Sequence, residues 1–172
     1  MKLTFSFLLT VLVSLSLTTH AQKCKLDVDD MDAFTKEHIK SGTSSIGGAF
    51  VRWSLTLKKT NNVFGWEMKM LIGGHIPEAL AKGEVVYCKL EDDRIIRLIV
   101  EQDCVPVYAV GNGQVVTNYS PKGVLDEASI KAFSESALSE MRVTISGNKL
   151  EPKVSEKQGD KIKNIARCLL VP

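Results

Sequence analysis

The alternation of hydrophobic and polar residues predicts β-strands over most of the chain. The clearest pattern covers residues 49–58 (AFVRWSLTLK), in which every second residue is hydrophobic. After a turn signal at residues 60–62 (TNN), the hydrophobic residues of 64–72 again fall on one side. Two alternating runs around a short asparagine-rich turn predict a long β-hairpin. Trp53 and Trp66 share its hydrophobic side, which favours core positions over a sugar-binding platform.

The same pattern predicts three further hairpins. They join residues 84–90 to 94–100, residues 105–110 to 114–120, and residues 141–146 to 149–154. Each has a turn signal between its two runs. In the first of them, a tight turn at Asp92–Asp93 would place Cys88 opposite Arg97. The glycines and the proline of residues 73–83 (GGHIPEALAKG) predict a connector without regular structure.

Two late segments have helical spacing instead. In residues 125–140, Asp126 is the expected N-cap residue, and the apolar positions that follow recur every three or four residues. In residues 155–170, Ser155 and Gln158 resemble a capping box. This second segment has an apolar stripe suited to docking on a sheet. The Ser-, Thr- and Gly-rich residues 33–47 predict a loop with a helical turn.

These elements predict a mainly β protein with an α+β class as the alternative. The expected architecture is an antiparallel, sandwich-like body of two sheets with two helices late in the chain, the C-terminal helix packed on a sheet. No internal repeat or linker divides the sequence. Residues 22–172 are therefore expected to form a single β-rich globular domain.

Residues 1–21 have the pattern of a secretory signal peptide. Lys2 precedes an apolar run, residues 3–17, and Thr19-His20-Ala21 supplies the small residues of a cleavage site. The run is too short to span a membrane comfortably. We therefore expect export to the periplasm or the extracellular space, without stable membrane insertion after cleavage. A lipid-anchored Cys24 is a weaker alternative, because Lys23 stands where lipoprotein processing needs a small residue.

The charge of the exported chain argues against nucleic-acid binding. Removing residues 1–21 takes away one basic residue and no acidic residue, which leaves 21 basic against 20 acidic side chains. A nucleic-acid-binding protein would carry a basic face or stripe. The expected partner is instead a protein or glycan of the envelope or the extracellular space.

All four cysteines lie in the exported part of the chain. They are Cys24, Cys88, Cys104 and Cys168. An even number in an exported protein indicates disulfides, although four cysteines allow three pairings. Because the ends of compact domains often lie close together, a Cys24–Cys168 bridge is the leading hypothesis. Another connectivity, or four reduced thiols, remains the alternative. No pair has the C-x-x-C spacing of redox or zinc motifs.

Four aspartates in six residues, beginning at Asp27, make residues 24–32 the most chemically suggestive segment. In residues 24–29 the aspartates alternate with apolar residues, which predicts a half-buried strand with its acids in water. The segment fails as an EF-hand, because Asp32 stands where that loop needs glycine. A looser calcium site at Asp29, Asp30 and Asp32 is the alternative.

Only His38 and His75 are candidates for a catalytic base, and each falls in a predicted loop. Neither belongs to an H-E-x-x-H motif. The sequence has no G-x-S-x-G elbow, no phosphate-binding loop and no dinucleotide fingerprint. A Cys–His pair lacks any local signature. No catalytic, cofactor-binding or metal-binding residue is therefore assigned.

Several stretches together resemble small exported β-rich bacterial proteins of the Bacteroidetes type. These are the leader ending in THA before QKC, then KCKLDVDD, WSLTLKK, CKLEDD and the closing NIARCLL. The resemblance implies no activity and no site residue. It adds weight to the pairing of an N-terminal cysteine with a C-terminal one.

The leading functional hypothesis is an exported, non-enzymatic binding or interaction domain of the cell envelope that uses no cofactor. One alternative is a small secreted hydrolase with His38 or His75 as its base. A second alternative is a calcium-dependent module built on Asp29–Asp32.

Overall fold

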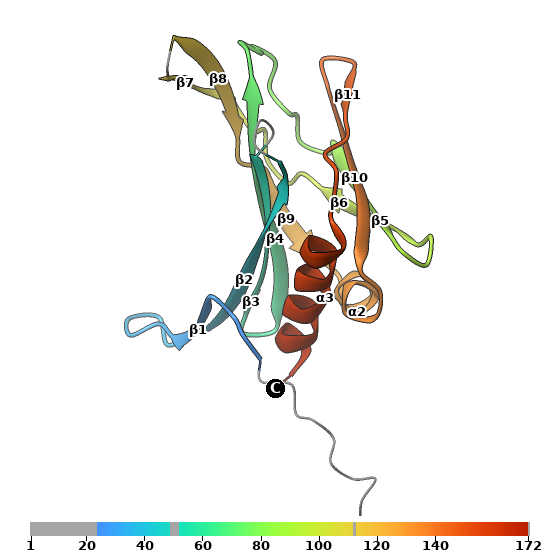
Figure 1. Cartoon of the computed structure of the whole chain (residues 1–172). Helices are drawn as coiled ribbons and strands as arrows, with labels where there is room; N and C mark the ends of the chain where they lie inside the picture. Colours follow the sequence, from blue (N-terminus) through green and yellow to red (C-terminus); the bar gives the residue numbers. More distant parts are fainter. Residues whose placement is uncertain (1–23, 49–51, 112, 172) are drawn as a thin grey trace, which may run out of the picture.

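Two antiparallel sheets form the body of the protein (Figure 1). The computed structural model describes residues 24–48, 52–111 and 113–171, so the predicted leader, residues 1–21, lies outside the described residues, as do Ala49, Val51 and Asn112. The strands of the larger sheet are β1 (Val28–Met31), β2 (His38–Gly47), β3 (Arg52–Thr60), β4 (Val63–Gly73), β7 (Val107–Gly111), β8 (Gln114–Tyr119) and β9 (Lys122–Leu125). Those of the smaller sheet are β5 (Val85–Leu90), β6 (Ile95–Ile99), β10 (Leu138–Ile145) and β11 (Asn148–Leu150).

The strand orders confirm the predicted mainly β architecture. The larger sheet runs β1-β2-β3-β4-β8-β7, and β9 pairs with the first half of β4, whose second half pairs with β8. The smaller sheet runs β11-β10-β5-β6. The four predicted hairpins are β3–β4, β5–β6, β7–β8 and β10–β11. Strand β9 was not predicted, because four residues are too few to show a periodicity.

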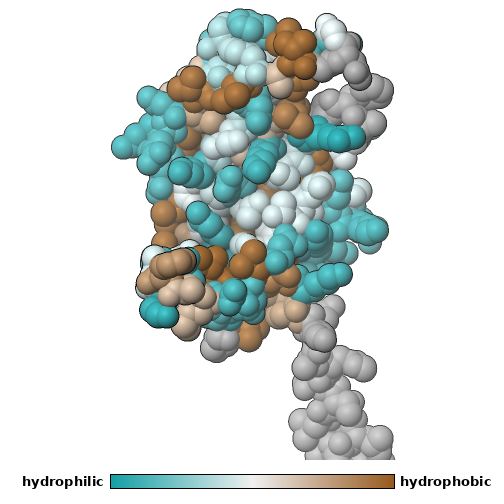
Figure 2. All heavy atoms as spheres, turned by 90° about the vertical axis from the view of Figure 1, so that its left-hand side faces the viewer, coloured by the Kyte–Doolittle hydropathy of each residue, from teal (hydrophilic) through white to brown (hydrophobic). Residues whose placement is uncertain are grey.

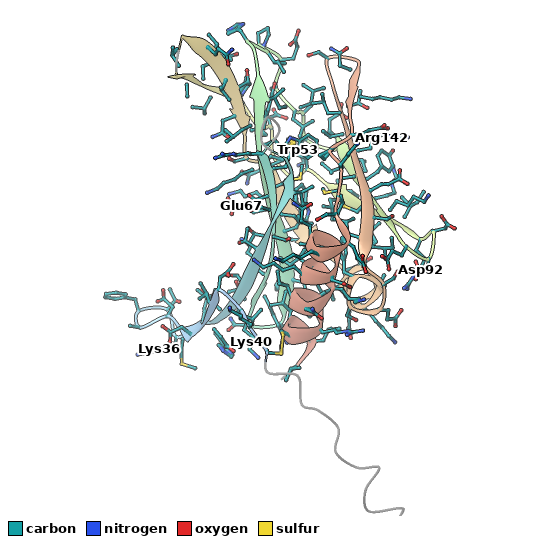
Figure 3. All side chains as sticks on the ribbon, in the orientation of Figure 1. Lys36, Lys40, Trp53, Glu67, Asp92 and Arg142 are labelled. Atoms are coloured by element: carbon teal, nitrogen blue, oxygen red, sulfur yellow. A yellow bond between two sulfur atoms is a disulfide. The ribbon has the colours of Figure 1, made fainter. Side chains whose placement is uncertain are left out.

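The hairpin of β3 and β4 forms the centre of the core, as predicted. Leu55 pairs with Met68 and Leu57 with Trp66, and all four side chains are buried. Trp53 is buried as well and points toward the smaller sheet (Figure 3). The tryptophans are thus core residues, as the alternation indicated. Their indole nitrogens have no hydrogen-bond partner among the described residues.

Strand β2 corrects the prediction of a loop over residues 33–47. From His38 to Gly47 the chain alternates regularly, with Lys40, Gly42, Ser44 and Ile46 on the buried side. These residues are mostly small or polar, so they gave no hydrophobic signal. The buried side is small because a helix packs directly on it: a Cβ at Gly42 would lie 2.7 Å from Cγ1 of Ile165.

The register of the hairpin between β5 and β6 differs by one residue from the prediction. Cys88 pairs with Ile96, and Tyr87 pairs with Arg97. The loop contains three residues instead of two, because Asp93 adopts a positive φ of 64° and its N–H donates to the carbonyl of Leu90. This adds one residue to the turn and moves every pair along by one position.

Two helices, α2 (Glu127–Glu135) and α3 (Glu156–Leu170), complete the fold. Helix α2 was predicted to continue to residue 140, but it ends at Glu135, and Leu138 already begins β10. Helix α3 contacts β2 and β3 of the larger sheet and β10 of the smaller one. In Figure 1 it stands between the lower parts of the two sheets. The predicted packing of the C-terminal helix on a sheet is therefore confirmed.

Close packing at the start of α3 depends on a glycine. A Cβ at Gly159 would lie 2.1 Å from the carbonyl oxygen of Leu138, which is far inside van der Waals contact. The Gln158 side chain holds the same turn with two hydrogen bonds. Its Oε1 accepts from the Ser155 N–H at 2.9 Å, as the capping box predicted, and its Nε2 donates to the carbonyl of Gly47 at 3.2 Å.

A disulfide joins Cys24 to Cys168 across 144 residues, with the two Cα atoms 5.4 Å apart. It ties the first described residue to the last turns of α3, as the leading hypothesis expected. Cys88 and Cys104 are free thiols. Burial raises the pKa of the Cys88 thiol well above its ordinary range, so this side chain behaves as a small core hydrophobe.

The N-cap residue of α2, Asp126, is expected to stabilise the fold in a pH-dependent way. The Asp126 carboxylate accepts from the Ser129 N–H at 2.7 Å. The pKa of Asp126 is lowered first by a hydrogen bond from the Ser129 side chain and then by this backbone hydrogen bond. Because the folded-state pKa is depressed, the stabilisation exists above the unfolded pKa and is lost as pH falls through the folded value. Asp126→Ala should cost about 1 kcal/mol in urea unfolding at pH 7 and less at acidic pH. A cost that does not depend on pH would contradict this role.

Candidate functional site

The outer face of the larger sheet is polar. Short hydroxyl side chains alternate with the core residues of β2 and β3, and the Oγ1 atoms of Thr43 and Thr56 lie 2.9 Å apart in a hydrogen bond across the two strands. Figure 2 looks onto this face: its middle is pale, with scattered hydrophilic groups, and the hydrophobic groups gather at the upper and lower ends. Glu67 lies on this face in Figure 3, on the side of the sheet opposite Trp53.

A groove of about 520 Å³ opens where the end of β2, the start of β3 and the adjoining parts of β4 and β8 meet. We call it the outer-face groove. It is lined by Ser45, Ile46, Gly47, Gly48, Arg52, Trp53, Ser54, Lys69, Leu71 and Asn118. The hydrogen bond from Gln158 to the Gly47 carbonyl ties one wall to helix α3. Helix α3 therefore helps the sheet to hold the backbone at this wall in place.

Two cations dominate the electrostatics of the outer-face groove. Arg52 pairs with Leu71 and Ser54 pairs with Lys69, so Arg52 and Lys69 are diagonal neighbours on one face of the sheet. Such positions are roughly 7–8 Å apart. Among the described residues, no carboxylate forms an ion pair with either side chain. Glu67 shares their face but lies outside ion-pair distance. The groove therefore has an uncompensated positive charge.

Neutral polar groups complete the lining. Ser45 and Ser54 bring hydroxyl groups, and Asn118 comes from β8, the strand paired with the second half of β4. The Asn118 Oδ1 atom is buried and has no hydrogen-bond partner in the described part of the chain. This set of groups donates and accepts hydrogen bonds around two exposed cations. Its chemistry suits an anionic, oxygen-rich ligand.

A larger hollow, of about 810 Å³, follows the solvent side of α3 next to the disulfide. Its lining mixes acidic and basic side chains, and several of them already have partners. Asp27 accepts from the Thr43 N–H, and Arg167 donates to the Ser134 carbonyl. Opposite charges close together offer no preference for either sign of ligand. The outer-face groove is thus the better candidate.

His38 lies at the start of β2, which corrects its predicted place in a loop. Its Nε2 is 2.8 Å from Oδ1 of Asp29, the geometry of a base held by a carboxylate, although both side chains are about half exposed. The adjacent hollow of about 330 Å³ is lined by His38, Lys40, Lys59, Asn61 and Asn62. None of these residues is a serine, threonine or cysteine, so the lining supplies no hydroxyl or thiol nucleophile beside His38.

His75 lies in the predicted connector between β4 and β5. Its ring stacks on Tyr108 with the ring centroids 4.4 Å apart. The pKa of Glu78 is lowered, first by a hydrogen bond from Ser146, then by one from its own backbone, and least by the charge of His75. Nothing in the described chain forms a hydrogen bond to the His75 ring. The hydrolase therefore remains a prediction.

Asp27, Asp29 and Asp30 are exposed, as predicted, and Asp32 is partly buried. They are not simply hydrated, because Asp29 contacts His38 and the other three accept backbone hydrogen bonds. Asp27 accepts from the Thr43 N–H at 2.7 Å, and Asp32 accepts from Phe34 and Thr35. Those two backbone hydrogen bonds lower the pKa of Asp32. Leu26 packs against the core, whereas Val28 is half exposed, so the expected burial of that strand face is confirmed at Leu26 and wrong at Val28.

The described residues include no group of three His, Cys, Asp or Glu side chains placed to hold a metal ion. Asp29, one of the three aspartates of the calcium hypothesis, faces His38. The calcium-dependent module stays a prediction.

Sequence reasoning did not single out the residues of the outer-face groove. Part of the signal for Arg52 and Lys69 was present, because both lie on the polar side of the predicted hairpin. Their diagonal placement needs the two-residue turn that the structure has, in which Thr60 pairs with Val63. Asn118 had no such signal, because the contact of β8 with β4 joins strands that are not consecutive.

Comparisons with protein-family models, with curated proteins and with solved structures found no match to this chain. Within the residues that the structure describes, neither helix is long and apolar enough to span a bilayer.

Proposed function

We propose that this protein is an exported, non-enzymatic binding domain that recognises an acidic polysaccharide through the outer-face groove. Export is inferred from the predicted leader at residues 1–21, and a disulfide is compatible with an oxidising compartment. The ligand would be a polymer of the cell envelope or of the surroundings that carries carboxylate or sulfate groups. The proposal includes no catalytic residue, no metal and no cofactor.

One observation carries the proposal: Arg52 and Lys69 lie on the same face of the groove without an acidic partner among the described residues. Two cations at diagonal sheet positions can contact two acidic groups of one chain. The Ser45 and Ser54 hydroxyls and the Asn118 amide suit the hydroxyl groups of sugars. A volume of about 520 Å³ lies within the range of small-ligand sites and leaves room for one or two sugar units.

The lining favours an acidic polysaccharide over a neutral one or a protein. Neutral sugars are bound largely by stacking on exposed aromatic rings, but the aromatic residue of this groove, Trp53, is buried in the core. Protein interfaces depend on large apolar or aromatic anchors. Of the large apolar residues in the lining, Leu71 is the one that is partly exposed. The groove would therefore recognise its ligand mainly through charge and hydrogen bonding.

Binding through two exposed cations is expected to be weak for one site and sensitive to salt. Exposed ion pairs contribute up to about 1 kcal/mol each, and hydrogen bonds to charged groups somewhat more. Interactions between exposed charges are screened over about 8 Å at physiological ionic strength. Useful affinity would then come from repeated contacts along a polymer.

Replacing the two cations should weaken this binding. We expect Arg52→Gln and Lys69→Gln each to lower the affinity for polygalacturonate by about five- to tenfold, because each loses one charged contact while the aliphatic stem stays in place. The measurement is isothermal titration calorimetry of the leader-free protein, with dextran sulfate as a second acidic polymer and dextran as the neutral one.

Lys149→Gln is the matched control, since Lys149 is an exposed lysine on β11 of the other sheet. It should leave the affinity unchanged. Equal losses of affinity in all three variants would mean that the net charge of the protein, and not the groove, determines the binding. A protein that binds neither acidic polymer would disprove the proposed function.

A further inference from the structure

Strand β7 is an unprotected sheet edge. The other outer strands are protected: β1 has Asp29 and Asp30, β11 has Lys149, and β6 lies against β9 of the other sheet. Strand β7 reads VYAVG, with neither a charge nor a proline. Val107 and Val110 are 64% and 76% exposed. Native proteins normally block such an edge with charges, proline or a covering segment, because it is a template for another strand.

The backbone of β7 has hydrogen-bonding groups directed away from its neighbour. Val110 pairs with Val115, and the Val115 carbonyl accepts from the Gly74 N–H at 2.8 Å, on the side of β4. The Val110–Val115 pair is therefore a non-hydrogen-bonded pair of the β7–β8 ladder. By alternation the same is true of the pair of Tyr108 with Thr117. The N–H and C=O groups of Tyr108 and Val110 then point outward, along the free edge.

The side chains of this edge are partly held in place already. The Tyr108 hydroxyl donates to the Ile76 carbonyl at 3.1 Å, and its ring stacks on His75. The connector thus supports the inner side of β7 and fixes the aromatic ring, but leaves the edge of the strand free in the described part of the chain. In Figure 1 the β7–β8 hairpin projects at the upper end of the larger sheet, away from the helices.

We propose that two copies of this chain pair through β7, antiparallel, with Ala109 on the two-fold axis. In this register Tyr108 of each copy lies opposite Val110 of the other. The outward N–H and C=O groups of these two residues then form four hydrogen bonds between the copies. Aromatic and β-branched residues are a favourable cross-strand pair. The small side chain of Ala109 meets its own copy at the axis, where antiparallel strands come closest.

A second copy fits this edge because a two-fold axis places a strand against itself. On a charged strand such pairing brings like charges together, which is unfavourable. Strands β1 and β11 would meet this penalty, whereas β7 has no charge to repel its copy. The pairing buries much less area than a stable interface needs, so the dimer is expected to be reversible and to form as concentration rises.

The consequence for ligand binding rests on the proposed function, although the pairing does not. Asn118 of the outer-face groove lies on β8 directly opposite Val107 of β7. The two-fold axis at Ala109 is perpendicular to the sheet, so both copies present their outer faces on the same side. Two grooves would share one continuous sheet face and could hold the same polymer. Linked sites raise the overall affinity without new contacts.

Cysteine cross-linking tests the pairing and its register. Ala109→Cys should form a disulfide-linked dimer under mild oxidation, because non-hydrogen-bonded antiparallel partners have Cα atoms about 4.5 Å apart. Val107→Cys is the matched control. Its two copies would lie about 13 Å apart along the strands and should not cross-link. The wild-type protein, which keeps Cys104, reports any background. Equal cross-linking at 107 and 109 would overturn the register.

Sedimentation equilibrium without cysteine chemistry provides the second measurement. The wild-type protein should shift from monomer to dimer as its concentration rises, in the absence of any ligand. Val110→Pro should stay monomeric and folded, because proline removes an N–H that points outward and takes no part in the pairing with β8. Val110→Thr should still dimerise. A wild-type protein that is monomeric up to its solubility limit, together with an Ala109→Cys variant that does not cross-link, would disprove the proposal.

Discussion

Replacing both Cys24 and Cys168 by alanine is expected to lower the free energy of unfolding by about 5 kcal/mol. The bridge spans 144 residues, and on the chain-entropy model a loop of that length loses about this much unfolded-state entropy when it is closed. It also holds the chain before β1 against the last turns of α3. The measurement is urea unfolding of the wild-type protein and the double variant under non-reducing conditions.

Reductant is the control for the disulfide prediction. It should bring the wild-type transition to that of the double variant and leave the double variant unchanged. Cys104→Ser, which removes a free thiol, should keep the full difference. The prediction fails if the wild type and the double variant unfold at the same urea concentration.

Gly159→Ala is expected to destabilise the protein by about 3 kcal/mol. Within a helix this substitution normally stabilises by about 1 kcal/mol. Here the added Cβ would meet the Leu138 carbonyl oxygen at 2.1 Å, and the backbone of β10 cannot rotate away as a side chain could. Helix α3 would have to shift, which also disturbs the hydrogen bonds of Gln158. The overpacking cost should therefore exceed the gain in helix propensity.

Asn164→Ala on the exposed side of α3 gives the matched comparison in the same urea experiment. It should be neutral or slightly stabilising, since no hydrogen bond of the Asn164 side chain is found among the described residues and alanine is the better helix former. If Gly159→Ala were as stable as the wild type, the close approach of α3 to β10 would be wrong.

The hairpins and helix starts could be predicted because their signals are local. Alternation in β3 and β4 reflects one buried side and one exposed side, and the turn at Asn61, which has a positive φ of 53°, lies between them. Asp126 and Ser155 mark helix starts through hydrogen bonds to residues three positions away. Such contacts depend on neighbouring sequence and hardly on the rest of the fold.

The errors arose where a distant contact decides the structure. Strand β2 shows no hydrophobic pattern because helix α3, more than a hundred residues later, needs small residues such as Gly42 beneath it. The end of α2 was misplaced because Leu138 pairs with Leu90 of β5. The β5–β6 register was wrong because Asp93 adopts a left-handed conformation, which aspartate tolerates but does not require.

The candidate site was predictable only in part. The register of one hairpin would have placed Arg52 diagonally across from Lys69 on a polar face. The part of the groove that Asn118 lines depends on β8 pairing with β4, although two strands of the other sheet lie between them in sequence. His38 and His75, chosen because each falls in a predicted loop, lie at different elements and have separate partners. A predicted loop position does not indicate which side chains the fold brings together.

The most direct test of the central claim is to map the ligand-binding surface by NMR. Backbone amide shifts of the isotope-labelled, leader-free protein would be followed while polygalacturonate is added. The account predicts that the perturbed amides cluster at Ser45, Ser54, Lys69 and Asn118, and that added salt reverses the shifts. Perturbations confined to the solvent side of α3, or none at all, would contradict it.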